Sequence, residues 1–491
     1  MRPTRVAGSF RDPAGHVFVA DGTVYRRIEP PGRGAYERLM QSGLYEALVR
    51  DGLLLPHEEI GGSQEQDPIG GSKVQDPPYV PSSQGTIVIR PERIPLISYP
   101  YEWCFSQLRD AALLTLRVQR TALQFGMSLK DASAYNVQFL RGRPVFIDTL
   151  SFDTLDEGPW IAYRQFCQHF YAPLVLWSQT DPQLGRLPQV FIDGVPLALA
   201  SRLLPRRSFL RAGPLLHIHL HAKAERRFAD RSRLRGPAAS AGQEGPRRMS
   251  EEGPRRAGKK GTRGVLALVE SLEHAVARTR WTPTSQWSSY YADQPSYGPE
   301  AFAAKVDLVT AWLDRVRPAT VWDIGANTGR FSRIAAQHAS LVVAFDADAA
   351  CVETMYREAR AEKLDRLLPL VSDLSSPSPG IGWANEERLT LEQRGPADMV
   401  LALALVHHLA VGNNVPLPAI AAYFARLGRQ LIIEFVPKSD AMVQGMLAGR
   451  RDIFDAYTVA EFEEAFAAHF RVDQRATLAP SDRILYLMTA R

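Results

Sequence analysis

Three polar side chains in the N-terminal half have the spacing of a phosphotransferase site. Asp131 lies five residues before Asn136, and Asp148 follows at the end of the apolar run "VFID". In phosphoryl transfer an Asp positions the attacking hydroxyl, while an Asn and a second Asp hold Mg²⁺. A spacing of this kind is also common by chance. The pattern therefore indicates a candidate Mg²⁺ and nucleotide site, with the interval to "VFID" as its support.

A second group of candidate residues follows the ends of apolar runs in the C-terminal half. The run "VWDI" is followed by Gly325 and Gly329. Glycines at such a turn let the backbone approach a ligand closely, and the helix-forming stretch after them offers free N–H groups. Asp346 ends the next apolar run, 21 residues after Gly325, where a carboxylate can bind both hydroxyls of a ribose. A third run ends at Asp373, which predicts a site along one sheet edge.

The order of the runs predicts the elements that position these residues. "ATVWDI", "SLVVAFD", "RLLPLVSD", "ADMVLALAL" and "RQLIIEFV" are short, rich in Val, Ile and Leu, and separated by helix-compatible stretches. This alternation is typical of a parallel sheet with crossover helices. The tail from 470 to 491 offers two more strands around a Pro-Ser-Asp turn, which predicts an antiparallel hairpin at a sheet edge.

On these motifs, residues 300–491 resemble a class I S-adenosylmethionine-dependent methyltransferase. The resemblance implies an α/β fold with a Rossmann-like sheet of seven strands. It assigns the Gly-rich turn to the methionine and ribose parts of the cofactor, Asp346 to the ribose and Asp373 to the adenine. The cofactor-binding residues that it implies are Asp323, Gly325, Ala326, Asn327, Gly329, Asp346, Asp373 and Leu405. A dehydrogenase fits less well, because its fingerprint has a third glycine that "DIGANTGRF" lacks.

Candidates for the methyl-transfer step follow the fourth and fifth runs. An alcohol or phenol acceptor must lose a proton, and a histidine suits that step at neutral pH. His407 and His408 are therefore candidate catalytic bases, although such a pair can simply shape the site. Glu434 is a candidate substrate contact or a structural hydrogen-bond partner. The insertion at 382–391 is either a lid over the acceptor or an ordered surface loop.

The N-terminal half follows the element order of a kinase-like α+β fold. A hairpin, a helix, strands leading to a hinge and a long amphipathic helix precede "LKDASAYN", and the half resembles aminoglycoside-phosphotransferase-like and protein kinases. It lacks their Gly-rich phosphate loop, and Arg26 and Arg27 stand where their lysine would be. The resemblance therefore favours an accessory domain that binds an acceptor or a nucleotide over an active kinase. The two-domain arrangement resembles a bacterial group of nodulation-protein-related methyltransferases.

Two repetitive segments predict the domain boundaries. "IGGSQEQDP" is followed by "IGGSKVQDP", and "EGPRR" occurs twice; such short polar repeats cannot bury an apolar face. We expect a kinase-like domain at 1–222 with a flexible insertion at 60–80, a basic disordered linker at 223–264, and a methyltransferase domain at 265–491.

Charge and composition limit the partners. From 222 to 264 there are thirteen Lys or Arg and five acids, so this segment has a net charge of +8. Because the whole chain has a net charge of +5, the remainder carries −3. Phe228 is the one aromatic residue in this segment, and so small an aromatic content makes nucleic acid a poor candidate partner. No run is long enough to span a membrane, and the start lacks the apolar region of a secretory signal. We therefore expect a cytoplasmic protein without a membrane partner.

The three cysteines stand alone in the sequence, which predicts neither a zinc site nor a disulfide scaffold. The resemblance favours a methyltransferase that uses S-adenosylmethionine and acts on an acceptor that the sequence does not identify. A phosphotransferase with a regulatory methyltransferase-like domain is one alternative, and a non-enzymatic binding scaffold is another. The oligomeric state stays open.

Overall fold

The computed structural model describes residues 3–60, 85–156, 158–234, 259–284, 298–449 and 451–491. Most of the predicted insertion at 60–80 and the middle of the predicted linker at 223–264 lie outside these ranges. The two ends of that linker are helical, because α9 (His221–Leu234) enters it from one side and α11 (Lys259–Arg278) from the other.

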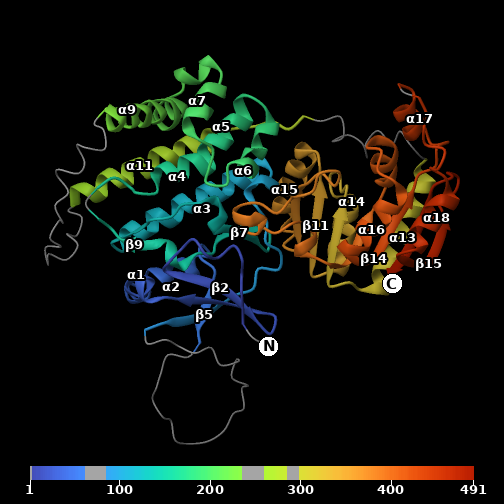
Figure 1. Cartoon of the computed structure of the whole chain (residues 1–491), viewed down its shortest axis with the longest axis horizontal. Coiled ribbons are helices and arrows are strands. Elements are labelled where there is room, and N and C mark those ends of the chain that lie inside the picture. The colour runs from blue at the N-terminus through green and yellow to red at the C-terminus, as the bar shows by residue number, and fades with distance from the viewer. Residues whose placement is uncertain (1–2, 61–84, 157, 235–258, 285–297, 450) are drawn as a thin grey trace, which may run out of the picture.

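The N-terminal half begins with a five-stranded antiparallel sheet. Its order is β1-β2-β3-β5-β4. The strands are β1 (Thr4–Arg5), β2 (Gly15–Ala20), β3 (Thr23–Ile28), β4 (His57–Glu59) and β5 (Ile87–Pro91), and the helices α1 (Pro30–Gln41) and α2 (Leu44–Arg50) lie beside them (Figure 1).

A long buried helix, α3 (Phe105–Gln124), organises the rest of this half. It carries thirteen buried residues, so it is surrounded by other elements. These are the strand pairs β6 (Met127–Leu129) with β9 (Phe152–Thr154) and β7 (Val137–Leu140) with β8 (Arg143–Phe146), and the helices α4 (Tyr163–Phe166), α5 (Ala172–Gln179), α6 (Leu187–Val190), α7 (Leu197–Leu203) and α8 (Ala212–Pro214). The half is therefore α+β, as predicted, while its kinase likeness stays a prediction.

The predicted start of the C-terminal domain, residue 265, falls within α11, whose packing the structure shows. Val265, Val269, Leu272 and Val276 are spaced by three or four residues and buried, so they form one apolar face. That face lies against α3 and α8 rather than against the C-terminal sheet (Figure 1). The helix α11 therefore packs with the N-terminal half.

The C-terminal half contains the expected seven-stranded sheet. Its order is β12-β11-β10-β13-β14-β16-β15, in which the first five strands are parallel and β16 is antiparallel to both neighbours. The strands are β10 (Thr320–Ile324), β11 (Leu341–Asp346), β12 (Leu367–Val371), β13 (Ala397–Ala402), β14 (Gly428–Phe435), β15 (Phe470–Thr477) and β16 (Ile484–Ala490). The predicted edge hairpin is β15 with β16.

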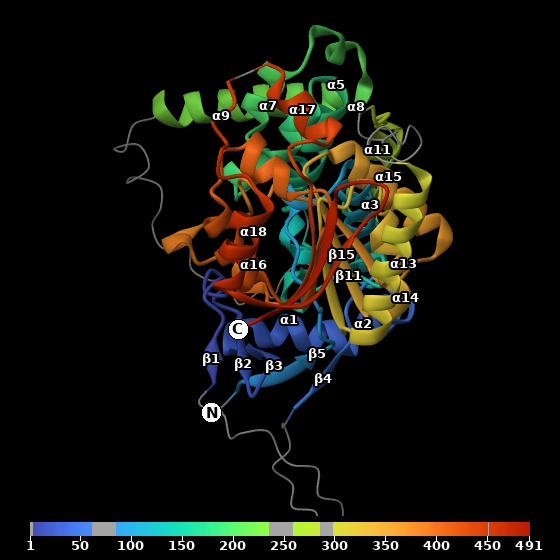
Figure 2. The same ribbon diagram turned by 90° about the vertical axis from the view of Figure 1, so that its right-hand side faces the viewer.

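Helices cover both faces of this sheet (Figure 2). One buried cluster joins the sheet to α13 (Pro299–Val316) and α14 (Arg330–His338), and another joins it to α16 (Leu417–Leu427) and α18 (Val459–Ala467). The remaining helices are α15 (Ala349–Glu362) and α17 (Ala441–Leu447). Among the described residues, no helix combines the length and the apolar character that crossing a bilayer requires.

The two halves meet through buried polar contacts between α3 and α15. The backbone N–H and the hydroxyl of Ser106 donate to the Glu353 carboxylate at 2.8 and 2.5 Å. Glu353 is fully buried, and its carboxylate accepts one of the backbone N–H groups that have no intrahelical partner at the start of α3. Tyr356 donates to Asp110 at 2.9 Å one turn further along. Because α15 follows the second strand of the sheet directly, the N-terminal half braces an element that adjoins the cavity described next.

Candidate functional site

A cavity of about 340 Å³ opens where the parallel strands β10 to β13 end. The strand order reverses between β11 and β13, with β10 at the turning point, and ligands of open α/β sheets bind at such switch points. Seven of the eight predicted cofactor-binding residues line the cavity: Asp323, Gly325, Ala326, Asn327, Asp346, Asp373 and Leu405. Gly329 does not line it.

The two glycines of the turn after β10 have different surroundings. Gly325 has a φ of +77°, and a Cβ there would lie 3.2 Å from Leu405, across the mouth of the turn. Gly329 begins α14 with a φ of +83°, and a Cβ there would meet Met355 at 2.8 Å. The lack of a side chain at Gly325 therefore leaves space beside Leu405 at the cavity wall, whereas the lack of one at Gly329 allows α14 to pack closely against α15.

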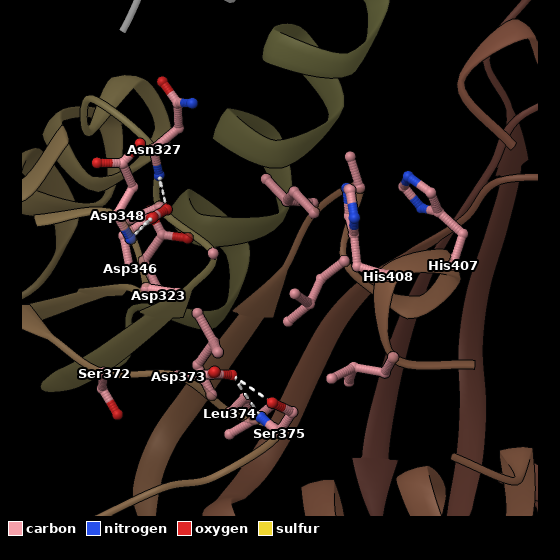
Figure 3. A pocket seen from close by; sticks show the side chains of 18 of the residues that line it. Asp323, Asn327, Asp346, Asp348, Ser372, Asp373, Leu374, Ser375, His407 and His408 are labelled. Atoms are coloured by element: carbon pink, nitrogen blue, oxygen red, sulfur yellow. Dashed lines mark hydrogen bonds between the residues drawn. The ribbon is translucent and has the colours of Figure 1, made fainter. Parts of the chain in front are cut away.

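The Asp346 carboxylate is held in place by two backbone donors. Asn327 N–H donates to one oxygen at 2.7 Å and Asp348 N–H donates to the other at 2.8 Å (Figure 3). Burial raises the pKa of Asp346 to about 6 despite these bonds. Burial also raises the pKa of Asp323 to about 6, against the effect of the hydroxyl of Ser332, which donates to it at 2.5 Å. Both carboxylates have lone pairs left for a ligand.

The charged residues that line the cavity are mostly acidic. They are four aspartates, Asp323, Asp346, Asp348 and Asp373, and one lysine, Lys305. Asp373 accepts the backbone N–H of Ser375 at 2.9 Å and its hydroxyl at 2.7 Å, which fixes its orientation. A polyphosphate would face repulsion from this set, whereas hydroxyl and ammonium donors would be attracted.

Two histidines lie on the opposite side of the cavity from the aspartates (Figure 3). The ring of His407 is 1% exposed, and its Nδ1 has no hydrogen-bond partner among the described residues. Burial lowers the pKa of His407 well below its usual value, and His408, Arg483 and Lys305 lower it further. Burial also lowers the pKa of His408. Both rings are therefore neutral at pH 7, and His407 has one nitrogen available to a bound molecule.

Glu434, the candidate substrate contact or structural partner, is not among the residues that line the cavity. It is fully buried and bonds to Lys305 Nζ at 2.6 Å and Arg483 Nη1 at 3.2 Å. Burial alone would raise the pKa of Glu434, but the two cations outweigh it and hold the pKa below its usual value. These contacts support the structural interpretation of Glu434.

Sequence reasoning missed Lys305, the cavity-lining residue that pairs with Glu434. Lys305 is 3% exposed and lies on α13 between Phe302 and Val309, which belong to the apolar face of that helix. A lysine within an apolar helical stripe was the available signal, because a buried cation requires a partner.

The insertion at 382–391 contributes no residue to the cavity and packs on the N-terminal half instead. Arg11 binds Glu387 with distances of 2.8 to 3.0 Å, and Tyr99 Oη accepts the Leu389 N–H at 2.7 Å. Arg388 lies over the ring of Tyr135 at 4.0 Å. The ordered-loop interpretation is the one that these contacts support.

The three N-terminal candidate residues belong to one polar network. Asn136 donates to Ser151 Oγ at 3.0 Å, and that hydroxyl donates to Asp148 at 2.7 Å. Asp131 is close enough to Asp148 for the second carboxylate to add to the effect of burial, and its pKa is raised. Arg26 forms an ion pair with Asp148 at 2.5 Å. Among the described residues there is no group of three or more His, Cys, Asp or Glu that could hold a metal ion.

Comparisons with known proteins identify the family. No protein-family model matches the chain. Among solved structures, it is 20% identical to magnesium protoporphyrin IX methyltransferase (ChlM) from Synechocystis PCC 6803 with bound SAM, covering 39% of this chain and 80% of ChlM, with a TM-score of 0.29.

Two other solved structures match with the same TM-score. The N-methyltransferase NodS from Bradyrhizobium japonicum WM9 is 9% identical, over 39% of this chain and 97% of NodS. The bifunctional kinase-methyltransferase WbdD is 15% identical, over 38% of this chain and 39% of WbdD. Likenesses this low define neither fold nor function.

A sequence relative gives a much stronger match. The chain is 34% identical to the nodulation protein NoeA of Rhizobium meliloti (strain 1021), over 99% of this chain and 96% of that protein. Because this identity extends over nearly the whole of both sequences, the protein belongs to the family of the nodulation protein NoeA.

Proposed function

We propose that the protein is an S-adenosylmethionine-dependent methyltransferase whose cofactor occupies the cavity at the ends of β10 to β13. The observation that carries the proposal is the charge of that cavity, with four aspartates and one lysine along its wall. S-adenosylmethionine brings a sulfonium, an ammonium and two ribose hydroxyls, which an acidic wall attracts. ATP and NAD bring phosphates, which the same wall repels.

Different residues of the cavity would contact different parts of the cofactor, as the resemblance implies. Asp346 would accept the ribose hydroxyls, since each of its oxygens already holds one backbone bond and has a further lone pair. Asp373 would face the adenine, and the turn from Gly325 to Asn327 would face the methionine part. When bound, the cofactor supplies an electrophilic methyl group.

His407 would receive the proton or the hydrogen bond of the acceptor. Its Nδ1 has no hydrogen-bond partner among the described residues, and its ring is neutral because burial lowers its pKa. A neutral imidazole can accept a hydrogen bond from a hydroxyl or an amine. His408 would help to shape the same wall.

The N-terminal half would act as a kinase-like accessory domain that braces the methyltransferase half and contributes to acceptor binding. Its candidate metal site does not fit Mg²⁺, because the guanidinium of Arg26 already pairs with Asp148 at 2.5 Å. We assign it no phosphoryl-transfer step. With three buried free cysteines, the protein suits a reducing cytoplasm.

Isothermal titration of S-adenosylmethionine into the full chain tests the proposal. We expect saturable binding by the natural protein and none detectable for Asp346→Ala. The matched control is Asp307→Ala, an exposed aspartate on α13, which should bind normally. The proposal is wrong if the folded natural protein does not bind, or if Asp346→Ala binds as the control does.

A further inference from the structure

The helical end of the N-terminal half exposes a cluster of large apolar side chains. Thirteen large hydrophobic residues are exposed among the described residues, and five of them fall within the 18 residues from 203 to 220. These five, which we call the apolar patch, are Leu203, Phe209, Leu210, Leu216 and Leu220, with exposed fractions of 39, 48, 89, 47 and 47%. Exposed apolar residues scattered singly are normal, but a concentration of this kind marks an interaction surface.

The elements that carry the apolar patch are bound together by His219. One ring nitrogen pairs with Ser201 on α7 and the other with Ser208, both at 2.8 Å. The ring of Phe209 stacks on the same imidazole with centroids 3.7 Å apart. The apolar patch therefore lies on a fixed backbone rather than on a loose loop. α7 and α9 lie together at one end of the molecule, away from the five-stranded sheet (Figures 1 and 2).

Basic side chains surround the apolar patch in the sequence and on the same elements. Between 196 and 227 there are seven Arg or Lys and one acid, a net charge of +6. All seven are exposed: Arg202, Arg206, Arg207, Arg211, Lys223, Arg226 and Arg227. The acid, Glu225, pairs with Arg164 at 2.8 Å. Arg226 also donates to the backbone oxygen of Ala198 on α7, at 3.4 Å, which keeps α9 beside the patch.

We propose that this surface docks the protein on an anionic lipid membrane. Exposed leucines ringed by arginines are typical of segments that lie in a bilayer interface, with the apolar groups among the acyl chains and the cations at the headgroups. A single-stranded nucleic acid fits less well, because its bases stack on aromatic faces, and Phe209, the one aromatic residue of the apolar patch, is stacked on His219. The contact would be peripheral. The sequence-based expectation of no membrane partner rested on the lack of a spanning segment, which does not bear on peripheral docking.

Sedimentation of the full chain with vesicles tests this proposal. We expect the protein to bind vesicles of phosphatidylcholine with one third phosphatidylglycerol, and to bind vesicles of phosphatidylcholine alone far more weakly. Added salt should weaken the binding, because surface charges are screened. The proposal is overturned if the anionic vesicles do not bind the protein, or if a single-stranded RNA binds it while the vesicles do not.

Two apolar substitutions test the role of the leucines. Leu210→Glu with Leu216→Glu should abolish binding to the anionic vesicles. Val190→Glu with Ile453→Glu is the matched control, because Val190 and Ile453 are also exposed, by 75 and 64%, and lie elsewhere. Circular dichroism establishes that both variants fold. Equal binding by the two variants would contradict the proposal.

Two charge reversals test the role of the arginines. Arg206→Glu with Arg211→Glu should weaken binding at least twentyfold, because each basic residue near an anionic surface contributes a factor of about five. Arg93→Glu with Arg143→Glu is the control, since both residues are exposed and neither belongs to the basic segment from 196 to 227. If the control variant loses as much affinity as the patch variant, the binding depends on overall charge and the assignment to this surface is wrong.

Discussion

Replacing Glu353 by alanine should destabilise the whole protein, because this residue joins its two halves. The Glu353 carboxylate accepts the backbone N–H and the hydroxyl of Ser106 and also pairs with Arg357 at 2.7 Å. Without it, two buried donors at the start of α3 lose their acceptor, and each such loss costs about 1–3 kcal/mol. We expect the free energy of unfolding to fall by about 3 kcal/mol, allowing for partial relaxation.

Urea unfolding measures this loss, with tryptophan fluorescence and far-ultraviolet circular dichroism as two probes. Glu358→Ala on the same helix is the control, because Glu358 is half exposed and pairs with Arg333 at the surface, where such pairs contribute about 0–1 kcal/mol. Glu353→Gln should cost less than Glu353→Ala, since an amide oxygen can still accept one bond. The reasoning is refuted if Glu353→Ala loses no more stability than Glu358→Ala.

Three further predictions concern buried side chains that can carry a charge. Lys305→Met should lower the free energy of unfolding by about 3 kcal/mol, since Glu434 would keep only Arg483 as a partner. Thermal unfolding measures this loss, with the exposed Arg315→Met as the control variant. Equal stabilities of the two variants would refute the prediction. Affinity for S-adenosylmethionine should fall about fourfold from pH 7.5 to 5.5, because Asp346, with its pKa of about 6, becomes protonated; titration calorimetry should show a flatter profile for Asp346→Asn. Burial lowers the pKa of His169 to about 4, so His169 contributes stability above pH 6.5 that is lost as the pH falls towards 4, up to about 3 kcal/mol; urea unfolding of His169→Gln should show less of this loss.

The aspartate side of the cavity was predictable because its residues sit at the ends of successive strands. Asp323 and Asp346 lie at the carboxyl ends of β10 and β11, and Asp373 follows β12. Parallel strands bring these ends to one edge. The local sequence pattern was enough to place these residues at one edge, because this required only that each apolar run forms a strand of the parallel sheet.

The parts that were missed or misplaced depend on contacts between distant segments. Lys305 and Glu434 are 129 residues apart, and Ser106 and Glu353 are 247 apart, so no periodicity links them. The side on which α11 packs was also undetermined, because an amphipathic helix has an apolar face but does not name its partner. The apolar patch was missed for a similar reason: a leucine-rich helical sequence predicts burial, and only the packing shows which leucines stay exposed.

The most direct test of the central claim is a competition between S-adenosylmethionine and ATP for this chain, monitored by titration calorimetry. The acidic cavity at the ends of β10 to β13 predicts saturable binding of S-adenosylmethionine that excess ATP with magnesium does not displace. Binding of ATP that displaces S-adenosylmethionine, or no binding of S-adenosylmethionine at all, would contradict the claim.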